Sequence, residues 1–139
     1  MAIASQLLKH KGRVIYSIAP QAPVLDAIRL MAEHGVGALL VMQGNELLGV
    51  VSERDYARKV ILKGRSSNET PVRQIMSSPV LTVRPEQSVH DCMRIMSEKR
   101  IRHLPVVDDN GVVGVLSIGD LVRARQAGHD RASAGAGIS

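Results

Sequence analysis

The sequence Gly49-Val50-Val51-Ser52-Glu53-Arg54-Asp55 is the most informative part of the chain, because a close copy follows 65 positions later as Gly114-Val115-Leu116-Ser117-Ile118-Gly119-Asp120. Each copy is a short apolar strand that runs into a Ser-x-x-Asp helix start. Aligned at that offset without a gap, residues 14–60 and 79–125 are identical at 14 of 47 positions, where unrelated segments would share about three. The chain is therefore a tandem duplication.

The composition restricts the class of protein. A chain of 139 residues suits one compact domain or two small ones that share a core, since a repeat of about 60 residues is marginal alone. The single cysteine, Cys92, excludes an intramolecular disulfide and a multi-cysteine metal site. No apolar run has the length of a signal peptide or a membrane span. We therefore expect a cytoplasmic protein without membrane association.

The charges and histidines argue against two classes of function. The net charge of +5 is spread along the chain, and Lys9, Lys11 and Arg13 form its densest cluster. Almost no aromatic residues are present to stack on bases, so a solvated basic surface is favoured over nucleic-acid binding. No two histidines have metal-ligand spacing, and the Ser-x-x-Asp pairs lack an adjacent histidine base. We expect a protein that is not an enzyme and holds no metal.

The apolar spacing predicts strand, helix, strand, strand and helix in each repeat. Strands are expected over 14–17, 36–42 and 47–51, and again over 80–83, 101–107 and 112–116. Helices are expected over 2–10, from Pro23 to Gly35, from Ser52 to about residue 63, from Ser88, and from Ser117 to about residue 126. Pro23 suits a first helical position, and Thr70 is expected to cap a short turn. The predicted repeats cover 10–68 and 74–127, followed by a disordered tail over 128–139. The predicted fold class is α/β, with two pseudo-twofold-related β-α-β-β-α repeats packed through their sheets and the helices outside.

The duplicated Ser-x-x-Asp has two interpretations that are compatible. As a capping box, its serine accepts a hydrogen bond from the third backbone N–H, and its aspartate favours the helix dipole. As a ligand site, the helix N-terminus attracts an anion, and the carboxylate one turn later accepts hydrogen bonds from a vicinal diol such as that of ribose. A nucleotide carries both groups.

The motif Gly-h-h-Ser-x-x-Asp (h, apolar), together with Ile101-Arg102-His103-Leu104-Pro105-Val106-Val107-Asp108, resembles the cystathionine-β-synthase (CBS) domain, here in tandem. The resemblance covers about residues 10–127 and is to free-standing bacterial CBS pairs, the Bateman-type module. It implies clefts between the repeats for adenosyl ligands such as AMP, ADP, ATP, NAD or S-adenosylmethionine. It also implies a homodimer that regulates an unknown protein in signal transduction.

The resemblance also assigns residues to the two clefts. In one cleft it joins Val50, Ser52, Arg54 and Asp55 to Pro79, Leu81, Ile101, Arg102 and His103. In the other it joins Val115, Ser117 and Asp120 to Lys11, Val14, Tyr16, Val36 and Gly37. The first repeat departs from the family pattern, because Gly37, Ala38 and Leu40 stand where Arg102, His103 and Pro105 stand. This predicts tighter phosphate binding in the Asp55 cleft, while the Asp120 cleft holds phosphate poorly or uses Lys11. A structural or dimerisation module without ligand is the alternative.

Overall fold

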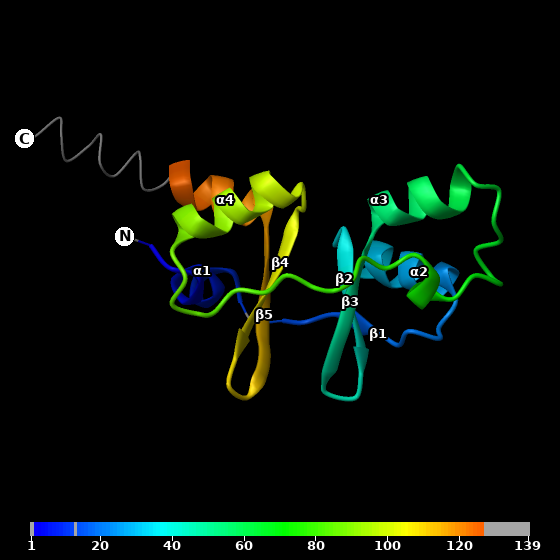
Figure 1. Cartoon of the computed structure of the whole chain (residues 1–139), viewed down its shortest axis with the longest axis horizontal. Helices are drawn as coiled ribbons and strands as arrows, with labels where there is room; N and C mark the ends of the chain where they lie inside the picture. Colours follow the sequence, from blue (N-terminus) through cyan, green and yellow to red (C-terminus); the bar gives the residue numbers. More distant parts are fainter. Residues whose placement is uncertain (1, 13, 127–139) are drawn as a thin grey trace, which may run out of the picture. The chain divides into compact units, whose positions relative to one another are not determined.

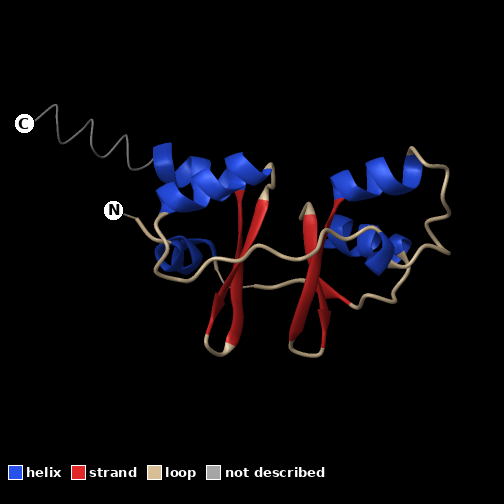
Figure 2. Cartoon of the chain, in the orientation of Figure 1, coloured by secondary structure: helices blue, strands red, loops and turns tan. Residues whose placement is uncertain are grey.

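The computed structural model describes residues 2–12 and 14–126, which divide into two compact units. The first-repeat unit is Ile15–Val80, and the second-repeat unit combines Met1–Val14 with Leu81–Ser139. Both units mix helices with a small sheet (Figures 1 and 2). The predicted α/β class is confirmed. The tail predicted over 128–139 lies outside the described residues.

The first-repeat unit is built on a three-stranded sheet of order β1-β2-β3. β1 (Ser17–Ile18) runs parallel to β2 (Ala38–Gln43), which forms an antiparallel hairpin with β3 (Glu46–Ser52). Its helices are α2 (Val24–His34), α3 (Glu53–Tyr56), the π-helix η1 (Ala57–Ile61) and the short 3₁₀ turn η2 (Val72–Gln74).

The second-repeat unit has the same hairpin in β4 (His103–Asp108) and β5 (Gly111–Ser117). Its helices are α1 (Ala4–Lys11), α4 (Val89–Lys99) and the helical residues 118–126. The register shifts between Val41 and Met42 in one hairpin and between Val106 and Val107 in the other. The duplication therefore preserves even this irregularity.

Each unit has its own apolar core, and the two cores are built from equivalent positions. Six buried pairs recur at the offset of 65, namely Val24/Val89, Ala27/Cys92, Met31/Met96, Leu39/Leu104, Val41/Val106 and Val51/Leu116. The helical and alternating periods of the sequence therefore select the core correctly. Among residues 2–12 and 14–126, no helix is long and apolar enough to cross a bilayer.

The described residues before Ile15, which are 2–12 and 14, belong with the second repeat rather than the first. Ile3 forms a bridge with Ser88, and the N–H groups of Ala4 and Val89 donate to Gln87 and Ala2. An equivalent bridge in the other unit joins Pro23 to Pro71, the residue before η2. The helix predicted over 2–10 is present as α1, but it contributes to the core of the second-repeat unit.

The strand predicted over 80–83 is wrong, because only Val83 forms a bridge, to Val106. In the first repeat, the Leu40 N–H donates to Tyr16 O and extends the pairing of β1 by one residue. Pro105 stands at the position of Leu40 and has no N–H to donate. The strand is therefore reduced to a single bridge in the second repeat.

Three further predictions are corrected. Pro23 is the N-cap of α2 and not its first helical residue. Thr70 does not cap the following turn, because Pro71 occupies the cap position and Thr70 instead accepts the Val24 N–H. The helix predicted from Ser52 to about residue 63 widens at η1, where Leu62 N–H donates to Ala57 O. The last turn is therefore wound as a π-helix, with one more residue per hydrogen-bonded ring than an α-helix.

Candidate functional site: two strand–helix junctions

The first junction lies where β3 runs into α3 and consists of a closed pair of side chains. The Asp55 N–H donates to Ser52 Oγ at 3.1 Å, and the Ser52 N–H donates to Asp55 Oδ2 at 3.0 Å. The Ser52 hydroxyl also donates to Asp55 Oδ2 at 3.0 Å. The predicted capping box is therefore confirmed, and the carboxylate is held at the positive end of the helix.

The second junction repeats this geometry between β5 and the helix over 118–126. The Ser117 N–H donates to Asp120 Oδ2 at 2.7 Å, and the Asp120 N–H donates to Ser117 Oγ at 3.2 Å. Both carboxylates are largely buried, with 13% of the Asp55 side chain and 9% of the Asp120 side chain exposed. Each repeat therefore presents one oriented, shielded carboxylate.

The helix starts have little capacity left to bind an anion through the backbone. The first amide of each helix donates to a carbonyl of its own repeat, Glu53 to Gly37 at 3.0 Å and Ile118 to Arg102 at 2.8 Å. The third amide donates to the serine of the capping box. At most the second amide of the first turn is left for a ligand, so a phosphate would depend mainly on side chains.

The two carboxylates differ in their ion pairs. Asp55 Oδ1 lies 3.2 Å from Lys59 Nζ, one helical turn later. Asp120 has two cations, because Oδ2 lies 2.7 Å from Lys11 Nζ and Oδ1 lies 2.8 Å from Arg123 Nη2. Burial alone would raise the pKa of Asp120, but the Lys11 hydrogen bond and charge and the Ser117 hydrogen bonds outweigh it and hold the pKa below its usual value. The resemblance assigned Lys11 to the Asp120 cleft as a residue for phosphate, and that role stays a prediction; in the structure its ammonium group is paired with Asp120 itself.

The strand edges beside the junctions are also covered differently. The Val50 N–H donates to Ser77 O at 3.1 Å, and the Ser77 N–H donates back to Val50 O at 2.9 Å. At the equivalent edge, Val115 O accepts from Lys11 Nζ at 2.8 Å. A backbone segment therefore covers one edge, and a lysine side chain contacts the other.

The glycine that opens each copy of the duplicated motif, Gly49 or Gly114, is required by packing. A Cβ atom at Gly49 would lie 2.7 Å from Met76 Sδ, and one at Gly114 would lie 2.6 Å from Leu8 Cδ2. The room left by these small residues is therefore filled by the chain itself.

Most of the other predicted residues make their contacts within their own unit, although Val14 lies in the second-repeat unit and Pro79 in the first-repeat unit. Gly37 and Arg102 contact the first turns through their carbonyls, and Val36 and Ile101 donate to the ends of the preceding helices at Met31 and Met96. Ala38 and His103 lie opposite Ser52 and Ser117 in the hairpins.

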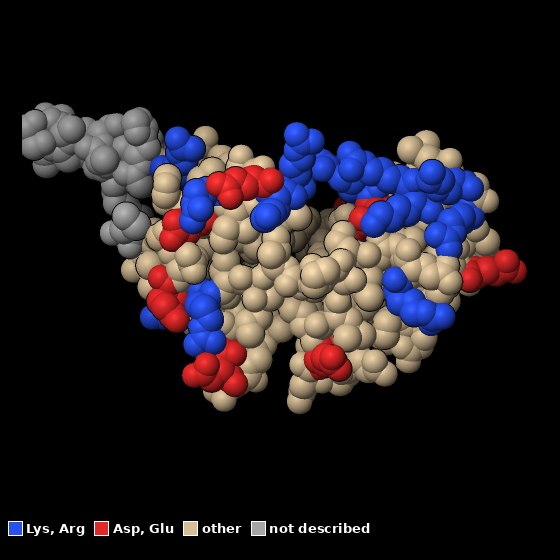
Figure 3. Space-filling view, viewed as in Figure 1, with Lys and Arg blue, Asp and Glu red and all other residues tan. Residues whose placement is uncertain are grey.

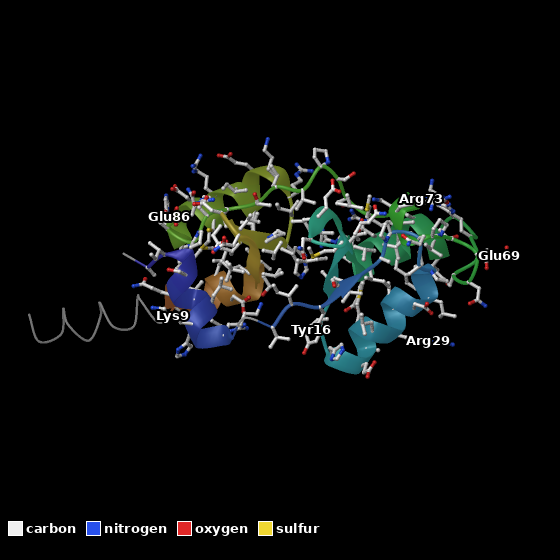
Figure 4. All side chains as sticks on the ribbon, turned by 90° about the horizontal axis from the view of Figure 1, so that it is seen from below. Lys9, Tyr16, Arg29, Glu69, Arg73 and Glu86 are labelled. Carbon is white, nitrogen blue, oxygen red and sulfur yellow. The ribbon has the colours of Figure 1, made fainter. Side chains whose placement is uncertain are left out.

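Tyr16 stacks on His34, with ring centroids 3.9 Å apart (Figure 4). Val14 and Leu81 are exposed, and Pro79 follows a cis peptide bond. The cross-repeat grouping of these residues stays a prediction.

Basic side chains gather over α3, η1 and the following loop (Figure 3). The basic residues of α3, η1 and the following loop are Arg54, Arg58, Lys59, Lys63 and Arg65. Arg54 is exposed and stands one residue before Asp55.

The sequence reasoning missed Lys59, Arg123 and Ser77. The first two lie four and three residues after the junction aspartates, a spacing that brings side chains together on a helix and was available as a signal. Ser77 has no such signal. Within residues 2–12 and 14–126, no group of three or more His, Cys, Asp or Glu side chains is placed to hold a metal ion.

Comparison with known protein families agrees with the duplicated junction. The family model described as the CBS domain matches twice, over residues 12–62 and 72–127. The chain belongs to the CBS-domain family. The predicted resemblance is thereby confirmed, and the Ser-x-x-Asp junctions occur once in each matched CBS domain.

Known CBS-domain proteins are similar over most of this chain. YhcV of Bacillus subtilis is 33% identical over 125 residues, which is 90% of this chain and 89% of YhcV. The mitochondrial CBSX3 of Arabidopsis thaliana is 48% identical over 106 residues, which is 73% of this chain but only 52% of CBSX3. This chain therefore matches about half of that plant protein.

Solved structures show the same fold. A CBS-domain protein of Burkholderia ambifaria MC40-6 with a suggested role in signal transduction has a TM-score of 0.87 at 50% identity, covering 91% of this chain and 95% of its own. PAE2072 of Pyrobaculum aerophilum, complexed with AMP, has a TM-score of 0.76 at 31% identity, covering 86% of this chain and 89% of its own.

Proposed function

We propose that this protein is a regulatory adenine-nucleotide sensor that binds ligand at its two strand–helix junctions. The observation that carries the proposal is the pair of oriented carboxylates, Asp55 and Asp120, each held by a capping serine at a helix start. The AMP complex of PAE2072, which has the same fold, supports this choice of ligand class. AMP is the first candidate, and ADP, ATP, NAD and S-adenosylmethionine share its adenosyl group.

In this proposal each carboxylate accepts hydrogen bonds from the ribose diol. Charge-assisted hydrogen bonds of this kind contribute about 1.5–3 kcal/mol. The serine positions the carboxylate by donating its N–H, so that the aspartate is in place before ligand arrives. The apolar residues assigned to each cleft would contact adenine, and Arg54, Arg102, His103 and Lys11 would face phosphate.

Regulation requires that ligand binding changes the balance between two states of the protein. A nucleotide shifts such a balance only by the difference between its affinities for the two states. We propose that this difference acts on a homodimer and is sensed by a partner protein. Light scattering of the purified chain with and without AMP measures the oligomeric state directly.

A structural module without ligand is the competing function, and one feature favours it. Ser88 and Asp91 at the start of α4 form a third Ser-x-x-Asp, in which the Asp91 N–H donates to Ser88 Oγ at 3.0 Å. This pair lies outside the duplicated junction motif and serves as a cap. Capping alone is therefore sufficient to explain a Ser-x-x-Asp in this protein.

The third pair supplies a matched control for the test. Asp55→Asn, Asp120→Asn and Asp91→Asn each remove one charge from the same position of a helix first turn. Thermal unfolding is followed with and without AMP, ATP, NAD and S-adenosylmethionine. A ligand present at about 100 times its Kd adds about 2.7 kcal/mol of stability. We expect the junction variants to lose this response in part and Asp91→Asn to retain it.

Each outcome decides between the two functions. If none of the four ligands stabilises the wild-type protein and none binds in calorimetry, the protein is a structural module without ligand. If the three variants lose equal stability and bind ligand equally well, the junction aspartates are caps only.

A further inference from the structure

Lys11 is the residue that distinguishes the two junctions most sharply. It ends α1, and its ammonium group lies 2.7 Å from Asp120 Oδ2 and 2.8 Å from Val115 O. In the first-repeat unit the equivalent position is Met76, and the Val50 edge is covered by the Ser77 backbone instead. A charged side chain therefore joins the strand edge to the carboxylate in the second repeat, and a backbone pair occupies the edge in the first.

The carboxylate of Asp120 is nearly saturated with donors. A carboxylate offers about four lone-pair positions. Three donors are already present, since Ser117 N and Lys11 Nζ contact Oδ2, and Arg123 Nη2 contacts Oδ1. A ribose diol donates two hydrogen bonds. Binding both hydroxyls therefore requires that one donor leaves the carboxylate.

A departing lysine needs a new counter-charge. If the diol replaces Lys11, the ammonium group keeps Val115 O but loses its anionic partner. A phosphate group on the same ligand restores a charge-assisted hydrogen bond, which a neutral nucleoside cannot do. Lys11 is the donor that leaves, because it shares Oδ2 with the backbone N–H of Ser117, which is fixed by the capping box. Oδ1 carries only Arg123 and has room for one hydroxyl.

We propose that Lys11 is a specificity-determining residue of the second junction, which holds the Asp120 carboxylate in the ligand-free protein and yields it only to a phosphorylated nucleoside. This inference rests on the proposed function and adds the ligand class that the Asp120 site selects. At the first junction, Asp55 has one ion pair at 3.2 Å and a serine hydroxyl that can rotate away. That junction therefore lacks this selection against nucleosides.

A ligand-free experiment tests whether Lys11 holds the carboxylate. The carboxyl carbon of Asp120 is titrated by NMR in wild type, Lys11→Met and Lys9→Met. Lys9 lies on the same helix with its side chain exposed (Figure 4), so its variant removes the same charge without the contact. We expect the pKa of Asp120 to rise in Lys11→Met and to remain at its wild-type value in Lys9→Met. An unchanged pKa in Lys11→Met overturns the inference, whatever the protein binds.

A binding experiment then tests selectivity. AMP and adenosine are titrated while the amide resonances of Ser117 and Asp120 report on the second junction alone. We expect Lys11→Met to tighten adenosine binding about 1.5- to fivefold, the range for loss of a partly exposed competing ion pair. AMP binding should weaken, and Lys9→Met should behave as wild type.

The outcomes separate the two levels of the argument. If AMP binds the wild-type protein and Lys11→Met leaves adenosine affinity unchanged or lower, the role of Lys11 is refuted while the proposed function stands. If neither AMP nor adenosine shifts the Ser117 and Asp120 resonances of the wild type, nucleotide binding at this junction is refuted, and the role of Lys11 with it.

Discussion

A single methyl group added at Gly114 or Gly49 should destabilise the protein through contacts with segments far away in the sequence. At Gly114 the new Cβ would lie 2.6 and 2.9 Å from the two methyl carbons of Leu8, a fully buried residue of α1. At Gly49 it would lie 2.7 Å from Met76 Sδ and 2.9 Å from Ser77 O. Neither glycine has a positive φ, so backbone strain is not involved.

The expected cost is the difference between two effects. Overpacking a filled site costs about 1–3 kcal/mol, while replacing glycine with alanine restricts the unfolded chain and returns about 0.4–1 kcal/mol. For Gly114→Ala we expect a net loss of about 1–2 kcal/mol, since the Leu8 methyl groups can shift slightly. For Gly49→Ala we expect a loss near the upper limit, because Ser77 O accepts the Val50 N–H and cannot retreat without weakening that bond.

Urea unfolding followed by circular dichroism measures these losses, since the chain has no tryptophan. With a slope of about 2 kcal/mol per molar urea, a loss of 1–2 kcal/mol lowers the midpoint by about 0.5–1 M. A double-mutant cycle assigns the cause. In a Leu8→Ala background the clash is removed, so Gly114→Ala should become neutral or stabilising. If Gly114→Ala costs the same with and without Leu8, the two sites are additive and the contact is not the cause.

Three further predictions concern other parts of the chain. Arg100 caps α4 with a φ of 55°, whereas the equivalent cap of α2 is Gly35. We therefore expect Arg100→Gly to raise the free energy of unfolding by about 0.5–1 kcal/mol and Gly35→Ala to lower it by a similar amount, both measured by urea unfolding. Burial raises the pKa of the Cys92 thiol from 9.0 to about 11. The thiol therefore ionises at lower pH in the unfolded chain than in the folded one, and the free energy of unfolding should fall between pH 9 and 11 in wild type but not in Cys92→Ala. A parallel loss in both proteins would exclude the thiol as the source. Fragment 15–80 contains the whole first-repeat unit, whereas fragment 1–68 lacks the last twelve residues of that unit and carries α1 without its core. We therefore expect 15–80 to unfold more cooperatively on heating than 1–68. A cooperative thermal transition in soluble 1–68 but not in 15–80 would contradict the assignment of these segments.

The local patterns of this protein were predictable because their causes are local. The hairpins, α2, α4 and the six repeated core pairs follow from apolar periodicity, which depends only on neighbouring residues. The capping boxes follow from Ser52 and Ser117, three residues before an aspartate. The loss of the strand over 80–83 was also readable in principle, because Pro105 has no N–H where Leu40 donates one.

The completion of the junctions was decided by the tertiary structure. Lys11 and Asp120 are 109 positions apart, and only the packing of α1 in the second-repeat unit brings them within 2.7 Å. Periodicity shows which face of α1 is buried but carries no information on which repeat buries it. In the same way, the two carboxylates at two helix starts are visible in the sequence, whereas long-range packing is needed to place Ser77 on one strand edge and Lys11 on the other. The difference between the two sites is therefore a property of contacts between distant segments.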